Sequence, residues 1–240
     1  MSHAWPFMTN ACNDPRIVRG MTEQLNVRRK LLNAGHKALG WKLAFGGPVA
    51  MERLGTTAPL VGFLTDRALL PSGSTVSLSG WAKPAAEPEI AVHIGKDLPG
   101  GADRATAIAA IAGLGPAIEL ADVDHPSDDV EGTLARNIFQ RHVLLGAKNA
   151  RRAGGVLEGL TGRVIRNDVE IAKVTDFQAL TGELIGIARH TANLLAAFGE
   201  KLEAGQVIIT GSIIPPPWVA PGEELVFRLE PVDTISVRFG

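Results

Sequence analysis

The chain has 240 residues, of which 45% are hydrophobic and 20% are charged, and its formal net charge at pH 7 is −1. These values are typical of a globular protein with a sizeable core, and they argue against nucleic acid or a membrane surface as a partner. No apolar run reaches the ~18 residues of a membrane span, and the N-terminus lacks the basic-then-apolar order of a signal peptide. The single cysteine, Cys12, rules out an internal disulfide framework and favours a cytoplasmic location.

The N-terminal part is predicted to combine helices with strands. Residues 1–13 are expected to form a loose arm. Asp14-Pro15 is a helix-start signal, and apolar residues then recur at near-helical spacing to about Asn33. The next predicted elements are a strand with an internal lysine at 39–45, a short helix at 48–54 and an apolar segment at 60–64.

Strands dominate from about Ala68. An alanine-rich helix is predicted from Asp103 to Leu114, long enough to be the crossover of a βαβ unit. The later elements are predicted as a strand at 139–146, a hairpin at 164–171, a helix at 182–198 and strands at 206–210, 224–229 and 234–239. This pattern predicts an α+β fold on a rolled, barrel-like mixed β-sheet with few flanking helices. We expect a small helical and strand region at residues 1–66 and a β-roll domain at residues 67–240.

Two carboxylates stand two residues apart in Glu87-Pro88-Glu89, directly before an apolar stretch. In an extended strand, residues at this spacing point to the same side. Like charges so close together raise each other's pKa unless a cation, a proton or water intervenes. Mg²⁺ or Mn²⁺ fits such an all-oxygen site. The same spacing also fits a solvated strand face, and Pro88 fits an edge strand or a bulge.

A third acid, Glu119, lies between Ile118 and Leu120 in a second apolar run, where a carboxylate needs a partner. Three acids from two strands would leave positions on a metal open for water and substrate. Asp122 and His125 follow this run, and the sequence assigns neither of them a role.

Lys42 lies between Trp41 and Leu43 in an apolar strand. Its ammonium could extend to solvent from a strand edge. Alternatively, it could lie beside the acids, where it would stabilise an enolate or transfer a proton. The sequence contains no P-loop, dinucleotide fingerprint, Gly-x-Ser-x-Gly elbow or Cys/His zinc spacing.

Four segments together resemble the fumarylacetoacetate hydrolase superfamily, and in particular its 2-keto-4-pentenoate hydratase and 2-oxo-3-hexenedioate decarboxylase branch. The segments are Gly40-Trp41-Lys42-Leu43, Pro84 to Ala91, Gly95 to Gly100, and Ala117 to Asp122. The match continues in order from about residue 38 to residue 240.

The resemblance implies a divalent metal, Mg²⁺ or Mn²⁺, held by Glu87, Glu89 and Glu119, with Lys42 as the catalytic residue beside it. It also implies a homo-oligomer and a small 2-oxo acid as substrate. The segment Thr210-Gly211-Ser212 is expected to bind that substrate, although a glycine turn explains it equally well. Ala44 to Gly47 and Arg136-Asn137 depart from the family pattern, which leaves the exact substrate open.

The implied activity is a hydratase that acts on a 2-hydroxy-2,4-dienoate in aromatic-compound catabolism, through a metal-stabilised enolate. A 2-oxo acid decarboxylase and an acylpyruvate-type carbon–carbon hydrolase are alternatives with the same metal. The hydrolase is disfavoured because Glu23 and His36 are too separated to be read as its histidine–glutamate pair. A non-catalytic scaffold is a remote alternative, since all three acids and Lys42 are present.

Overall fold

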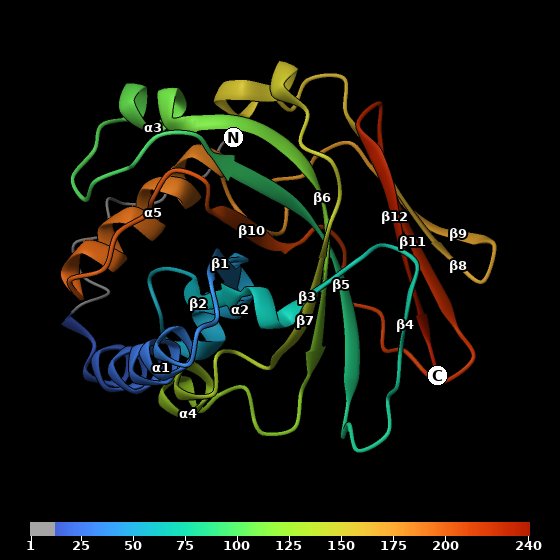
Figure 1. The fold of residues 1–240 in the computed structure, drawn as a ribbon, viewed down its shortest axis with the longest axis horizontal. Helices are drawn as coiled ribbons and strands as arrows, with labels where there is room; N and C mark the ends of the chain where they lie inside the picture. The colour runs from blue at the N-terminus through green and yellow to red at the C-terminus, as the bar shows by residue number, and fades with distance from the viewer. Residues whose placement is uncertain (1–12) are drawn as a thin grey trace.

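The computed structural model describes residues 13–240, and their strands form two β-sheets (Figure 1). The larger sheet has seven strands in the order β2-β1-β10-β5-β6-β7-β3, and the smaller has five in the order β4-β12-β11-β8-β9. The strands are β1 Ala38–Ala44, β2 Leu60–Thr65, β3 Leu69–Leu70, β4 Ser74–Val76, β5 Pro84–Ile94, β6 Ile111–Asp122, β7 Gln140–Leu145, β8 Thr161–Arg166, β9 Val169–Val174, β10 Val207–Ser212, β11 Glu224–Glu230 and β12 Asp233–Phe239. Parallel and antiparallel pairs occur in both sheets, so the predicted rolled mixed sheet of an α+β fold is confirmed.

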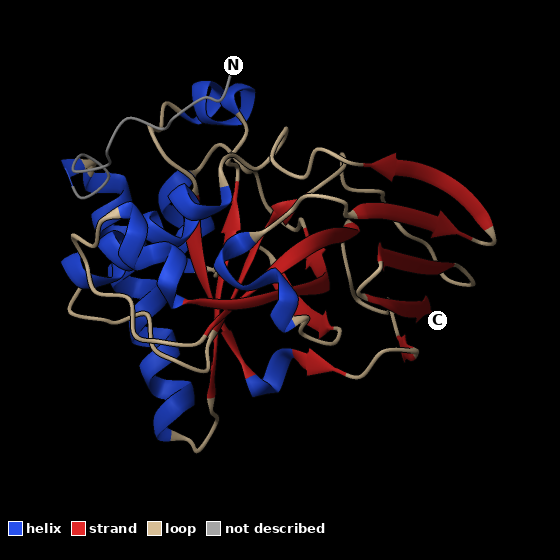
Figure 2. Ribbon diagram, turned by 90° about the horizontal axis from the view of Figure 1, so that it is seen from above, coloured by secondary structure: helices blue, strands red, loops and turns tan. Residues whose placement is uncertain are grey.

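Most helices of the described residues lie on one side of the folded molecule, and the five-stranded sheet lies on the opposite side (Figure 2). The α-helices are α1 Pro15–Asn33, α2 Pro48–Leu54, α3 Arg104–Ala110, α4 Val130–Ala135 and α5 Leu184–Ala197, with 3-10 turns at η2 Asp66–Ala68 and η3 Ala150–Gly155. None of these helices is both long and apolar enough to pass through a lipid bilayer.

Helix α1 begins where the sequence predicts it, because the Asp14 carboxylate accepts the backbone N–H of Arg16 at 2.9 Å. Its apolar residues Ile17, Met21 and Leu25 recur every four positions and are buried. The predictions for Cys12 and for the arm up to residue 12 lie outside the described residues.

The predicted βαβ crossover between the two acid-bearing strands is wrong. Helix α3 ends at Ala110, and Ile111 already begins β6, which pairs with β5 in antiparallel orientation. A helix of seven residues spans only about 10 Å. Strand β6 has twelve residues and spans about 40 Å, so the helix is too short to carry the chain back along β5. The chain therefore turns around and pairs directly.

The other predicted elements are confirmed, with boundaries shifted by a few residues. Asn167 and Asp168 make the tight turn of the β8–β9 hairpin, with φ angles of 48° and 64°. The division at residue 66 stays a prediction. Strands β1 and β2 come from the first part and join the same sheet as β10 and β5 from the second.

The curl of the seven-stranded sheet brings distant strands together. Strand β1 is three positions away from β6 in the sheet, a separation of about 14 Å along a flat surface. Lys42 on β1 nevertheless contacts Glu119 on β6 directly. Side chains from β1, β5 and β10 therefore line one cavity, and Glu119 of β6 contacts Lys42 beside it.

Candidate active site

Three glutamates converge on one point through the register of β5 and β6. Glu87 lies opposite Glu119, and Glu89 lies two residues further along the same face of β5. Glu89 and Glu119 have no exposed surface, and Glu87 is half-buried. One carboxylate oxygen from each of the three lies within 4.8 Å of the others.

Burial of these acids has a clear electrostatic consequence. It raises the pKa of Glu89 well above its ordinary value, and the Glu119 and Glu87 carboxylates raise that pKa further. Burial also raises the pKa of Glu119 to about 7, against the opposing charge of Lys42. Each of these two carboxylates has one oxygen that is buried without a hydrogen-bond partner: Oε1 of Glu89 and Oε2 of Glu119. Unpartnered oxygens of this kind are suited to a cation.

Lys42 is buried beside the acids, with 2% of its surface exposed. Its Nζ contacts the carboxylate of Glu119 and donates to the backbone carbonyl of Ile138 at 2.8 Å. Of the two placements that the sequence left open, the structure shows the one beside the acids, and Lys42 does not extend to solvent. An ammonium has three N–H donors, so one remains for a ligand.

The carbonyl that accepts from Lys42 belongs to an unusual turn. Asn137, Ile138 and Phe139 have φ angles of 58°, 52° and 61°, so three successive non-glycine residues are left-handed. This conformation costs about 1–2 kcal/mol per residue. The Asn137 side chain fixes the turn on strand β2: it accepts from the Phe63 N–H at 2.8 Å and donates to the Phe63 carbonyl at 2.9 Å.

Gly62 on β2 leaves the space that this arrangement needs. A Cβ atom at Gly62 would lie 2.9 Å from Oδ1 of Asn137 and 2.9 Å from Cγ of Lys42. Contacts this short force neighbours to move. The glycine thus allows the lysine and the asparagine to pack against the same stretch of backbone.

The predicted substrate-binding segment, Thr210 to Ser212, forms a β-bulge. The register between β10 and β5 shifts by one residue between Ile209 and Ser212, and Gly211 adopts φ 96°. The Gly211 N–H turns away from the ladder and donates to Oε2 of Glu89 at 2.6 Å. The Thr210 hydroxyl donates to the Ile90 carbonyl at 3.2 Å, whereas the buried Oγ of Ser212 has no partner. Ser212 is therefore the hydroxyl that remains available to a ligand.

A cavity of about 620 Å³ opens above these groups. Lys42, Glu87 and the Thr210 to Ser212 segment line it. Most of its other walls are apolar, and they are formed by Ala44, Phe45, Val49, Ala50, Ala85, Val123, Ile138, Phe139, Leu180, Ile214, Pro215, Pro216 and Trp218. A mostly apolar cavity with a few convergent polar groups is typical of a small-molecule site.

Asp122 and His125 lie outside the acid cluster. Asp122 is buried, accepts the N–H groups of Ala82 and Lys83, and pairs with Arg141, so it ties the start of β5 to β7. His125 bonds Asp124 at 2.7 Å and packs its ring against Phe139, with 4.3 Å between the ring centroids.

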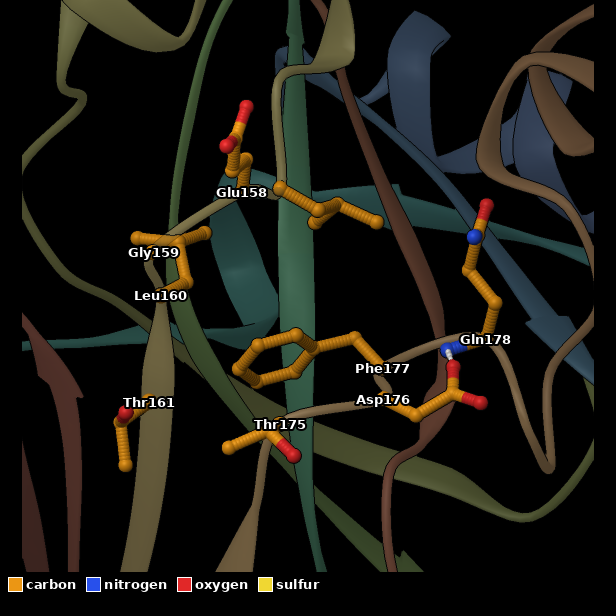
Figure 3. Close-up of a pocket in the computed structure, with 9 residues that line it drawn as sticks. Glu158, Gly159, Leu160, Thr161, Thr175, Asp176, Phe177 and Gln178 are labelled. Atoms are coloured by element: carbon orange, nitrogen blue, oxygen red, sulfur yellow. Dashed lines mark hydrogen bonds between the residues drawn. The ribbon is translucent and has the colours of Figure 1, made fainter.

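A second hollow, of about 430 Å³, lies between the start of β8 and residues 175–178 (Figure 3). Its polar lining includes Glu158, Asp176 and Gln178, and the Asp176 carboxylate accepts the Gln178 N–H at 3.0 Å. Neither Lys42 nor the three converging glutamates line this hollow, so it has a different chemical character from the cavity at the acids.

The sequence pattern gave no role to several residues of the site. The hydrogen bonds of the Asn137 side chain and the left-handed turn depend on a contact with Phe63, 74 positions away. Arg53 and Lys83 also line the cavity, and no motif or spacing in the sequence marks either of them as a site residue. The only hint in the sequence was that Arg136-Asn137 departs from the family pattern, since these residues lie at this turn.

The family model for the fumarylacetoacetate (FAA) hydrolase C-terminal region matches residues 28–239. The chain belongs to the fumarylacetoacetate hydrolase family. Among its relatives, 4-oxalocrotonate decarboxylase of Pseudomonas putida is 29% identical over 235 residues, which cover 97% of this chain and 89% of that protein. The 2-hydroxyhexa-2,4-dienoate hydratase of Comamonas testosteroni is 28% identical over 211 residues, which cover 86% and 80%.

Among solved structures of this family, 4-oxalocrotonate decarboxylase from Pseudomonas putida G7, complexed with magnesium and adipate, superposes with a TM-score of 0.81. It is 29% identical to the chain, and the match covers 90% of this chain and 83% of that one. The predicted membership in this branch of the superfamily is thus confirmed.

Proposed function

We propose that this protein is a divalent-metal-dependent hydratase of a 2-hydroxy-2,4-dienoate, acting in aromatic-compound catabolism. The observation that carries the proposal is the convergence of Glu87, Glu89 and Glu119 on one point beside Lys42, at the base of a mostly apolar cavity. Relatives named as hydratases of 2-hydroxyhexa-2,4-dienoate and 2-keto-4-pentenoate support the reaction class.

The donor set fits a hard divalent ion. All three groups are carboxylates, two of them fully buried, and two buried oxygens lack any partner. Three carboxylates beside a single lysine carry an excess of negative charge that Mg²⁺ or Mn²⁺ would neutralise. Glu87, Glu89 and Glu119 would hold the ion. When bound, it would supply Lewis-acid stabilisation of negative charge at the substrate's 2-oxygen.

Lys42 would act directly on the substrate. Among residues 13–240, only Glu119 and the Ile138 carbonyl contact its ammonium, and they fix its direction. The third N–H would donate to the oxygen on which charge develops. In the hydration of a dienol, a proton adds to the terminal carbon and water then adds to the resulting enone. Lys42 lines the cavity and would donate that proton, and the unpartnered hydroxyl of Ser212 would orient the substrate carboxylate.

The test is an assay of the hydration of 2-hydroxypenta-2,4-dienoate. The loss of the dienol absorbance is recorded once in Mg²⁺ and once in EDTA. Glu89→Ala should abolish the reaction. Glu170→Gln, which removes an exposed carboxylate from β9, should leave it unchanged. Turnover that persists at the same rate in EDTA would contradict the proposal.

A second candidate is decarboxylation of a 2-oxo-enedioate. The specific observation in its favour is that the relatives with 29% identity and the structure with a TM-score of 0.81 are named 4-oxalocrotonate decarboxylases. Release of CO₂ from 2-oxohex-3-enedioate, measured beside hydration of the dienoate, separates the two reactions.

We also propose a homo-oligomer in the cytoplasm. The single-cysteine composition supports a reducing compartment. Strand β9 is an edge of the five-stranded sheet and exposes Val169 and Ile171, with 63% and 44% of their surface accessible, which supports self-association there. Light scattering of the purified protein and of Ile171→Lys tests the assembly, because a charge on this edge should dissociate it.

A further inference from the structure

Two cationic side chains border the outer part of the cavity. Arg53 comes from α2 and Lys83 from the residue before β5, and both line the cavity. They meet the same segment, because Arg53 donates to Oγ of Ser127 at 3.3 Å and the Lys83 carbonyl accepts the Val123 N–H at 3.0 Å. We call Arg53 and Lys83 together the rim cations.

Within residues 13–240, neither rim cation lies within ion-pair distance of a carboxylate. In the adjoining segment, Asp122 and Asp124 both pair with Arg141, and Asp128 is within ion-pair distance of neither rim cation. The rim cations are therefore two positive charges at the mouth of a cavity without a protein counterion.

Lys83 is directed onto the cavity wall. Its Nζ lies 4.1 Å from the ring centroid of Trp218, and Trp218 also lines the cavity. The backbone N–H of Lys83 donates to the buried carboxylate of Asp122 at 2.8 Å, which fixes the main chain at this residue. Arg53 is similarly tied to the mouth through Ser127.

The charges at the two ends of the cavity suggest what it accepts. At the floor, Lys42 and one bound divalent cation would balance the charge of the three glutamates. A ligand that carried one carboxylate would leave the rim cations in excess. A ligand with a second carboxylate at its far end would bring negative charge to each end of an apolar chain, opposite a positive group in each place.

We propose that Arg53 and Lys83 recognise the distal carboxylate of a dicarboxylic 2-oxo acid or 2-hydroxydienoate, and so select diacids over monoacids. This inference rests on the proposed function, since the cavity floor must hold the 2-oxo acid end. It adds a specificity-determining pair on α2 and at the start of β5.

The test measures binding rather than turnover, with two saturated probes that differ only at the far end: 2-oxoadipate, a diacid, and 2-oxohexanoate, a monoacid. Titration calorimetry with excess Mg²⁺ is carried out on the wild type, on Arg53→Gln/Lys83→Gln and on Lys96→Gln. Lys96 is an exposed lysine just beyond the other end of β5, so its variant controls for loss of charge alone.

The wild type should bind 2-oxoadipate roughly tenfold more tightly than 2-oxohexanoate, an effect kept modest by the solvent exposure of both cations. The double variant should lose this preference with the affinity for 2-oxohexanoate unchanged, and Lys96→Gln should retain it. Equal affinity of the wild type for both acids overturns the inference and leaves the proposed function standing. If neither acid binds in Mg²⁺, the proposed function fails and the inference fails with it.

Discussion

Asn137 extends the edge of the seven-stranded sheet by pairing its side-chain amide with both backbone polar groups of Phe63. Strand β2 is the outermost strand on that side, so these groups of Phe63 would otherwise have no strand to bond. One asparagine therefore satisfies the sheet edge and holds the left-handed turn whose Ile138 carbonyl receives Lys42.

Replacement of this amide should be costly. Asn137→Ala leaves two buried backbone groups unpaired and releases the turn, so we expect a loss of about 2–4 kcal/mol in the free energy of unfolding. Urea denaturation measures it. Asn193→Ala, which removes one exposed hydrogen bond to Gly101, should cost less than about 1 kcal/mol. Equal losses of unfolding free energy in the two variants would mean that the two hydrogen bonds between Asn137 and Phe63 are energetically unimportant.

Gly62→Ala tests the space shared by Lys42 and Asn137. The added methyl would sit 2.9 Å from atoms of both side chains, and we expect about 1–3 kcal/mol of destabilisation together with reduced turnover. Gly186→Ala adds the same methyl to α5, where the nearest atom is the flexible end of Glu183 at 3.2 Å, and should be neutral or slightly stabilising. If Gly62→Ala melts like the wild type, the packing around Lys42 is looser than the structure indicates.

Glu89→Gln should separate stability from metal binding. The pKa of Glu89 is raised by burial and by two neighbouring acids, so the neutral amide should raise the melting temperature of the metal-free protein by a few degrees. The wild type should be stabilised by about 2.7 kcal/mol when Mg²⁺ is present at a hundred times its dissociation constant.

The variant should lose that response, and Glu170→Gln should keep it. Thermal unfolding in EDTA and in a Mg²⁺ series gives both quantities. An unchanged Mg²⁺ response in Glu89→Gln would remove this carboxylate from the ligand set.

His190 should make stability depend on pH. Burial lowers its pKa to about 4, and its Nε2 lies 3.0 Å from the Pro59 carbonyl. Because the unfolded chain takes up the proton near pH 6.5 and the folded chain only near pH 4, stability is complete above pH 6.5 and is lost as pH falls through this window.

The loss from His190 should reach about 2 kcal/mol by pH 5. His190→Gln has no titrating group there and should show a shallower decline between pH 7 and pH 5 in urea titrations. Parallel pH profiles of the two proteins would refute the assignment.

The sequence predicted those features that depend on local spacing. Glu87 and Glu89 share a face because strands have a period of two, and Lys42 is conspicuous because a cation interrupts an apolar strand. Features that depend on long-range pairing were missed. The antiparallel meeting of β5 and β6 and the bulge at Gly211 are decided by which strands become neighbours. The turn at Asn137 adopts a backbone conformation that Ile138 and Phe139 disfavour, so only its contact with β2 accounts for it.

In the proposed metal site, the pairing of Glu87 with Glu119 across β5 and β6 would couple correct assembly of the sheet to cation affinity. If β6 slid by a single position, Glu119 would turn to the reverse side of the ladder and leave its two companions behind. A misaligned sheet would then be unable to capture the ion. Metal binding would therefore stabilise only the molecules in which these two long strands have paired in the correct register.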